Sequence, residues 1–181
     1  MAPALSAAVL AVLAIVFGLT GLPWQPLSAG IGAVVVAAAV WALSLVVRPG
    51  SAPTGAPRGA PWLVPAGVAV GAVLTALRPA LFLGGPDNPS QTNDAVFHLN
   101  ALRYIADTGS ASSLDLTGML GAATIYPAAW HAPASLVFMM GTDIVVAANA
   151  MSLVIGGAVW TLGVAWLTLV ATRGDRLAAA A

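Results

Sequence analysis

Residues 27–47 read LSAGIGAVVVAAAVWALSLVV, a stretch without a charged side chain. A helix of about 20 apolar residues is long enough to cross the hydrocarbon core of a bilayer. The stretch therefore predicts a membrane-spanning helix. The composition agrees, because 60% of the 181 residues are hydrophobic and only 7% are charged. The chain has no Cys and no basic cluster, which argues against disulfides, thiolate metal sites and nucleic-acid binding.

Three further apolar runs predict spans at Ala4 to Leu22, Pro61 to Leu83 and Asp143 to Thr172. The first is also compatible with a signal peptide, but no Lys or Arg precedes its apolar part and a short turn joins it to the next run. We therefore expect the first two runs to form a transmembrane hairpin. The predicted fold class is an all-α polytopic integral membrane protein with about four transmembrane helices.

The Arg residues predict the orientation in the membrane. Arg48 and Arg58 lie in the connector after the second run, and Arg173 and Arg176 follow the last run. Arg in short loops favours the cytoplasmic side. We predict a multi-pass protein of a bacterial plasma membrane with both termini cytoplasmic.

Two domains follow from this orientation. Residues 1–60 form the hairpin and its cytoplasmic loop. Residues 61–181 form a second unit, with spans at 61–83 and 143–172, an extracytoplasmic loop at 84–142 and a cytoplasmic tail at 173–181.

A composition with Arg but no Lys, and Asp but no Glu, is typical of a GC-rich bacterial genome.

The extracytoplasmic loop is expected to contain two juxtamembrane helices. The first covers about 91–107, with Ser90 or Thr92 as its cap and Gly109 as its stop. The second covers 126–140, opens at Pro127 and is altered by Pro133. It is too short to cross the membrane, so we interpret it as juxtamembrane or re-entrant. A Gly141 to Asp143 turn follows, with Asp143 capping the last span.

Asp94 and His98 lie one helical turn apart on the first loop helix. Because charged residues are so rare here, their clustering points to function. On a helical wheel both share the apolar side, which predicts that they face the membrane domain, whereas Arg103 and Asp107 share the polar side and can pair. The alternative is structural: Asp94 favours the start of the helix and His98 is only its partner.

The second loop helix begins near Tyr126, Trp130 and His131. Tyr and Trp commonly anchor a protein at the membrane interface. His131 is either a ligand at head-group level or a polar tip at that interface. In the last span, small and polar residues share one stripe and predict close helix packing: Asn149, Ser152, Gly156 and Gly163.

Three motifs carry a family resemblance: DAVFHLNALRYI at 94–105, TGSASSL at 108–114 and YPAAWH at 126–131. They resemble an uncharacterised actinobacterial family of multi-pass membrane proteins, mainly over residues 86–172. More distantly, the order of parts is similar to the GT-C superfamily of membrane glycosyltransferases. That order is a span, an outer loop opening with an Asp-bearing helix, a Tyr-Pro-led helix and another span.

The GT-C resemblance implies a catalytic Asp in the outer loop and a sugar donor on a polyprenyl phosphate. Asp94 matches that Asp, as a general base on an acceptor hydroxyl or a ligand of a divalent cation, with His98 as its catalytic neighbour. The substrate-binding candidates are Arg103, Tyr126, Trp130 and His131. GT-C enzymes have many more spans, so we expect this chain to be the amino-terminal part of an enzyme, inactive alone.

A second interpretation is a non-catalytic membrane protein. The loop would then contact other membrane subunits or lipid, as part of an assembly or a lipid-binding scaffold. A transporter is less favoured, because the predicted spans carry few polar residues at mid-depth and show no pair of broken helices. The two main interpretations differ in whether Asp94 is needed for chemistry or for assembly.

Overall fold

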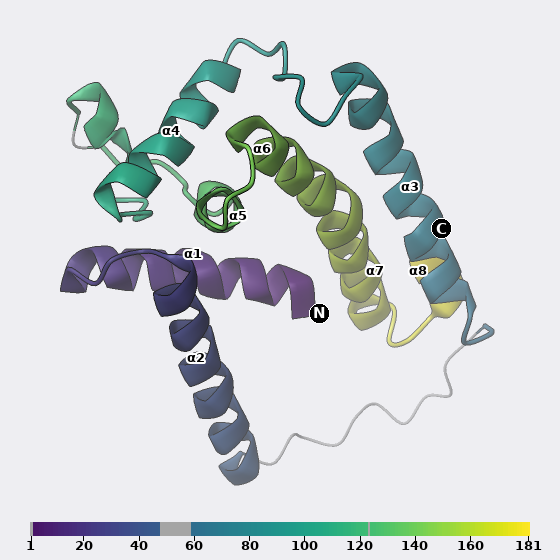
Figure 1. Cartoon of the computed structure of the whole chain (residues 1–181). Coiled ribbons are helices and arrows are strands. Elements are labelled where there is room, and N and C mark those ends of the chain that lie inside the picture. Colours follow the sequence, from purple (N-terminus) through teal and green to yellow (C-terminus); the bar gives the residue numbers. More distant parts are fainter. Residues whose placement is uncertain (1, 48–58, 123) are drawn as a thin grey trace.

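The computed structural model describes residues 2–47, 59–122 and 124–181. These residues form helices and no strand, so the predicted all-α class is confirmed. Arg48 and Arg58, on which the predicted cytoplasmic loop depends, lie outside the described residues. The helices (Figure 1) are α1 (Ala2–Thr20), α2 (Pro26–Val46), α3 (Leu63–Leu83), α4 (Ala95–Thr108), the 3-10 helix η1 (Leu116–Leu120), α5 (His131–Met139), α6 (Ile144–Leu153), the π-helix η2 (Val154–Val159), α7 (Trp160–Ala171) and α8 (Arg176–Ala180).

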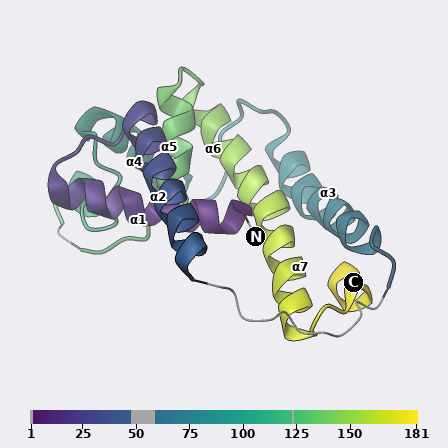
Figure 2. The same cartoon turned by 90° about the horizontal axis from the view of Figure 1, so that it is seen from below.

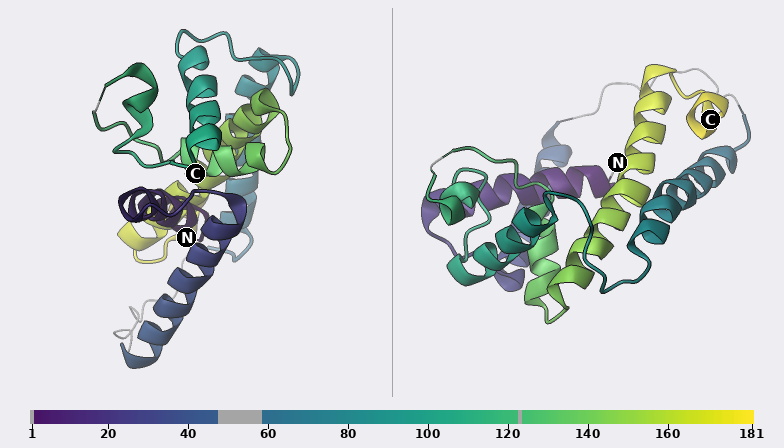
Figure 3. Two further views of the ribbon diagram at one scale, coloured as in Figure 1. Left: turned by 60° about the vertical axis from the view of Figure 1, so that its left-hand side comes forward. Right: turned by 90° about the horizontal axis from the view of Figure 1, so that it is seen from above.

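Three helices of the described chain are long and apolar enough to cross a membrane, not four. They are α2, α3 and the continuous α6–η2–α7 helix over Ile144–Ala171. The apolar stretch of α1, Leu5–Thr20, is shorter. It runs crosswise to α2 instead of antiparallel to it (Figures 1 and 3), so the predicted hairpin of two spans is not formed. Hydropathy marked α1 as apolar but did not reveal that α1 packs on α5.

The main core lies where α1, α4 and α5 meet, and Ala111, Leu116 and Ala128 between α4 and α5 complete it. Trp24, in the turn between α1 and α2, is 1% exposed, and its Nε1–H donates to Ser135 Oγ at 3.2 Å and the Ala132 carbonyl at 3.3 Å. Its backbone N–H donates to the Gly109 carbonyl at 2.7 Å. One side chain thus ties the amino-terminal segment to α5, and its backbone ties it to the end of α4.

The α3 helix and the last span lie side by side (Figure 2), and a small residue lets them approach. Gly157 is buried, and a Cβ placed on it would lie 3.2 Å from the Ala76 Cβ. Gly156 and Gly163, which the sequence placed on the packing stripe, have open space instead, so that prediction is wrong for them. The reason is the π-helix η2, whose extra residue rotates the stripe.

Two helix ends match their sequence signals, and Pro133 is compatible with the start of a third helix. Gly109 ends α4 in the left-handed region at φ 68°, and its N–H donates to the Ile105 carbonyl. The Asp143 carboxylate accepts from the backbone N–H groups of Val145 and Val146 at 2.8 and 3.2 Å, so it caps α6. Pro133 lies in the first turn of α5, where the missing N–H removes no helical hydrogen bond.

The starts of α4 and α5 were predicted too early. The α4 helix begins at Ala95 with Asp94 at its N-cap position, so Ser90 and Thr92 are not its caps. The α5 helix begins at His131 and not at Pro127. Both shifts have one consequence, because Asp94 and His131 each come to lie at the start of a helix instead of within one.

Candidate functional site

Asp94, His98 and His131 form a hydrogen-bonded series. His98 Nε2 lies 3.1 Å from Asp94 Oδ2, and His98 Nδ1 lies 2.9 Å from His131 Nε2. The sequence suggested the Asp94–His98 pair from its spacing. Nothing in the sequence pairs residues 98 and 131, because that contact depends on how α5 packs against α4.

Exposure falls steeply along this series. The side chain of Asp94 is 66% exposed, that of His98 is 30% exposed, and His131 is only 2% exposed. Asp94 is the N-cap residue and does not lie on the apolar helix side that we expected, and its carboxylate is largely exposed. It still borders the last span, because it lines a cavity together with Val145 and Ala148 of α6. The series leads from solvent into the protein interior.

Aromatic rings surround the two imidazoles. The Trp130 ring lies 5.5 Å from that of His98 and 5.0 Å, edge to face, from that of His131. Tyr126 lies 5.7 Å from His131, and Phe97 lies 6.2 Å from it. Tyr126 and Trp130 therefore contact the site directly. Phe97 was not singled out from the sequence, where it is one apolar residue among many.

Burial holds His131 neutral. Burial and, second, the neighbouring His98 lower the pKa of His131 to about 4, although the Pro127 backbone opposes the shift. Among the described residues, no group meets hydrogen-bond geometry at the buried His131 Nδ1. His131 is therefore an uncharged imidazole with one ring proton at neutral pH.

The outer carboxylate has the opposite character. Hydrogen bonds from Thr92 and, second, from His98 hold the pKa of Asp94 below its usual 3.8. The group is therefore ionised at neutral pH and only accepts hydrogen bonds. The series thus begins with an exposed anion and ends in a buried neutral ring.

Hydrogen-bond chemistry couples the two rings. His98 donates from Nε2 to Asp94, so a neutral His98 accepts at Nδ1 and requires a proton on His131 Nε2. A proton added at His98 Nδ1 reverses that bond and requires the His131 proton to be on Nδ1. The protonation state of the partly exposed His98 therefore determines which tautomer the buried His131 adopts. Acid–base chemistry uses coupling of this kind between neighbouring rings.

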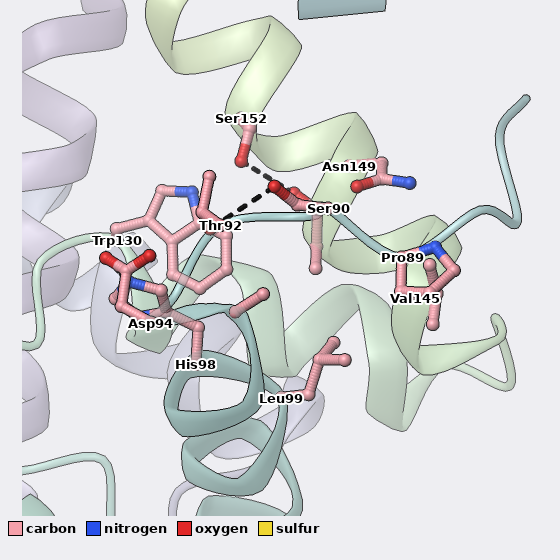
Figure 4. Close-up of a pocket in the computed structure, with 12 residues that line it drawn as sticks. Pro89, Ser90, Thr92, Asp94, His98, Leu99, Trp130, Val145, Asn149 and Ser152 are labelled. Carbon is pink, nitrogen blue, oxygen red and sulfur yellow. Dashed lines mark hydrogen bonds and ion pairs between the residues drawn. The ribbon is translucent and has the colours of Figure 1, made fainter. Parts of the chain in front are cut away.

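Asp94 and His98 lie at the edge of a cavity of about 260 Å³, here called the Asp94 cavity (Figure 4). Its walls come from the start of α4, the preceding loop and α6. The polar groups on it are hydroxyls, an amide, an imidazole and one carboxylate, and none of the lining residues is Lys or Arg. Besides Asp94 and His98, the polar and aromatic residues that line it are Ser90, Thr92, Trp130, Asn149 and Ser152.

Arg103 lies away from this cavity. Its guanidinium lies over the Phe138 ring, 5.2 Å from the ring centroid. The predicted ion pair with Asp107 is not formed, since within the described residues the His98–Asp94 contact is the one ion pair. No group of three or more His, Cys, Asp or Glu side chains in the described chain is placed to hold a metal ion. A divalent cation in the Asp94 cavity would find one carboxylate there.

Fold and site together define a helical membrane protein whose carboxylate–imidazole site lies beside the ends of its spanning helices. The chain belongs to the Family of unknown function (DUF6541), whose profile matches residues 1–181. The predicted resemblance to an uncharacterised family is thus confirmed, and it covers the whole chain instead of mainly residues 86–172. Neither the curated proteins nor the solved structures contain a match.

Proposed function

We propose that the Asp94 cavity is the acid–base site of a membrane glycosyltransferase-like protein. It would act on the extracytoplasmic face with a polyprenyl-phosphate-linked sugar donor. The observation that carries this proposal is the Asp94–His98–His131 series at the edge of a cavity lined by hydroxyl and amide groups. An ionised, oriented carboxylate that is open to a cavity is suited to accept a proton from a substrate hydroxyl.

The reaction needs one proton acceptor at Asp94. The carboxylate removes the proton of the acceptor hydroxyl while that oxygen attacks the anomeric carbon of the sugar. The bond from this carbon to the phosphate oxygen of the lipid breaks, and the phosphate leaves with the electron pair. His98 orients the carboxylate through its Nε2–H, and His131 orients His98. Trp130 offers an aromatic face to the sugar ring.

The orientation in the membrane is part of this proposal. Arg173 follows the last span, which favours a cytoplasmic end there and places the loop between α3 and α6 outside. Trp24 bonds to α5 of that loop, which supports an external start for α2. With α1 lying crosswise, the amino terminus would then be external, in contrast to our expectation from the sequence.

Cysteine labelling tests this orientation without background, because the chain has no native Cys. In intact cells, a membrane-impermeant maleimide should label Ser6→Cys, whereas Thr172→Cys should react only after lysis. Labelling of position 6 that also requires lysis would restore the cytoplasmic amino terminus.

The Asp94→Asn variant tests the chemistry. In membranes that carry the protein in its native form, sugar transfer from the lipid-linked donor should fall by about 100-fold or more, the scale of general-base catalysis. Asp107→Asn is the matched control, because it changes an exposed carboxylate on the same helix, and it should transfer at the wild-type rate. Unchanged turnover in Asp94→Asn, with an unaltered size-exclusion profile, would remove Asp94 from the mechanism.

A non-catalytic membrane assembly or lipid-binding subunit is the second candidate, favoured by the isolation of α2. Only 6% of its most apolar window is buried, and its main contacts within the described chain are with α1. A span so little covered by its own chain is suited to pack against a helix of another subunit. This candidate predicts that Asp94→Asn lowers recovery of a stable complex and leaves no sugar-transfer activity to lose.

A further inference from the structure

A second hollow lies next to the Asp94 cavity. It is a groove of about 330 Å³ between the carboxyl end of α3 and α6, here called the apolar groove. Most of its walls are hydrocarbon side chains, from Ala80 and Leu83 of α3 and from Val146, Ala150 and Leu153 of α6. Both helices are candidate spans, so the groove lies where the hydrocarbon of a bilayer meets its head groups.

The two hollows lie on adjacent faces of one helix. Residues spaced by three or four positions share a helix face, and neighbouring residues are turned by about 100°. One stripe of α6 lines the Asp94 cavity and the next lines the apolar groove, with Asn149 on both. The cavity stripe is Val145, Ala148 and Ser152, and the groove stripe is Val146, Ala150 and Leu153.

A buried amide fixes the boundary between them. Asn149 is 7% exposed, and its Nδ2 donates to the Pro86 carbonyl at 3.0 Å and to the Asn88 carbonyl at 2.8 Å. On one side of this anchor, residues 84–86 line the groove, and on the other side Pro89 and Ser90 line the cavity. Figure 4 shows Asn149 and Ser90 among the residues that line the Asp94 cavity. The relative position of the two hollows is therefore built into the fold.

The walls select different parts of a ligand. The apolar groove offers hydrocarbon contacts and suits an alkyl chain. The Asp94 cavity offers hydroxyls, an amide, an imidazole and an indole face, which suit a head group with hydroxyls. An anionic head group would meet the ionised Asp94 with no Lys or Arg on the cavity wall to balance it.

We propose that the Asp94 cavity and the apolar groove together bind one single-chain amphiphile. Its alkyl chain lies in the groove, and its uncharged, hydroxyl-bearing head lies against Asp94. This inference rests on the proposed function in taking Asp94 as the group that meets a hydroxyl. It goes further by assigning the hydroxyl-bearing reactant, rather than a phosphate, to this cavity.

Photolabelling tests the proposal without relying on turnover. The full chain is placed in phosphatidylcholine nanodiscs with a dodecyl glucoside that carries a diazirine at the end of its chain. Saturable labelling is expected within residues 80–86 and 146–153, and unlabelled dodecyl glucoside should compete more strongly than dodecyl phosphate. Ala150→Trp fills the groove from an exposed position and should lower this labelling several-fold. Ala38→Trp, at an exposed alanine of α2, should leave it unchanged.

Two results would overturn the proposal. One is labelling that does not saturate and that Ala150→Trp leaves unaltered, since the groove would then be ordinary lipid-facing surface. The other is stronger competition by dodecyl phosphate, since the head would then be anionic. Saturable labelling in a protein whose Asp94→Asn variant still transfers sugar would sustain the binding site and contradict the proposed function. Sugar transfer that is lost in Asp94→Asn, without saturable labelling, would sustain the proposed function and contradict the binding site.

Discussion

Two regions of this molecule are apolar for different reasons. The loop region, made of α1, α4, η1 and α5, buries its side chains against one another, and Ala101, Leu102, Ile105 and Leu116 are each 0% exposed. The span region, made of α2, α3 and α6–η2–α7, buries only 6%, 0% and 11% of its most apolar windows. The loop region therefore obtains its order from contacts between distant residues, whereas the spans leave most of their apolar surface exposed, as helices that cross a membrane do.

The difference extends to polar groups. In the loop region, the Trp24 and Ser135 side chains bond across more than a hundred positions of sequence. At α7, in the last span, the hydroxyls of Thr161, Thr168 and Thr172 donate to carbonyls of their own helix. A substitution should thus lower stability strongly where the side chain bonds to residues distant in the sequence. It should lower stability only slightly where the side chain bonds within its own helix.

The largest effect is expected from Trp24→Ala. Removing a fully buried aromatic side chain from a core costs about 3–5 kcal/mol of unfolding free energy. Trp41→Ala is the matched control, because Trp41 is 67% exposed on α2. In detergent, thermal unfolding should shift strongly for Trp24→Ala and little for Trp41→Ala, with helix content retained in both. Equal shifts would contradict the contrast between the regions.

The next effect is pH dependence from His131. Its folded pKa of about 4 lies below the unfolded value of 6.5, so the unfolded chain binds a proton first as the pH falls. Stability from this group is complete above pH 6.5 and is lost progressively down to pH 4, by about 3 kcal/mol in all.

The variant His131→Phe isolates this contribution. Thermal unfolding recorded between pH 7 and pH 4.5 should show a weaker decline in the variant than in the wild type, since the buried titrating ring is gone. An identical decline in both proteins would assign the pH dependence to other groups.

A smaller effect is expected within the spans. Gly157→Leu forces a side chain against Ala76 and should cost about 1–3 kcal/mol through overpacking. Gly156→Leu meets open space and should gain up to about 1 kcal/mol, because Leu favours helix over Gly. Thermal unfolding of the two neighbours in the same detergent checks the sign of each change. A destabilised Gly156→Leu would show that the sequence-predicted stripe does pack.

The smallest effect is expected at Arg103. The exposed contact of its guanidinium with Phe138 contributes about 0.5–1 kcal/mol. Arg103→Met should lower stability by this amount and leave the Asp94 cavity intact, whereas Asp107→Ala should change nothing because its pair with Arg103 is absent from the described chain. Chemical unfolding curves of both variants provide the test. A loss in Asp107→Ala would mean that the predicted ion pair forms in solution.

Local signals were sufficient for much of the span region. Apolar length predicted α2, α3 and the last span, Gly109 predicted the end of α4, and Asp143 predicted the cap of α6. Each of these depends on a residue and its immediate neighbours, so the sequence contains the whole cause. The spacing of Asp94 and His98 predicted their contact for the same reason.

Other features depend on residues that are distant in the sequence. The crosswise course of α1 follows from packing on α5, and the His98–His131 contact follows from packing of α4 on α5. Trp24 has no sequence signal of its own, because a Trp in a turn between apolar runs equally suits a membrane interface. The apolar groove needs two helices and a loop to exist at all.

The π-helix at Val154–Val159 divides the last span into two halves with different angular phase. One additional residue in a turn rotates all later side chains of the helix by about 100° relative to an uninterrupted helix. A cysteine-accessibility scan from residue 144 to residue 171 should therefore show two periodic patterns that do not join. Residues before the π-helix, which line the two hollows, and residues from Gly157 onward, which pack against α3, can then vary independently, because one helical repeat no longer relates them.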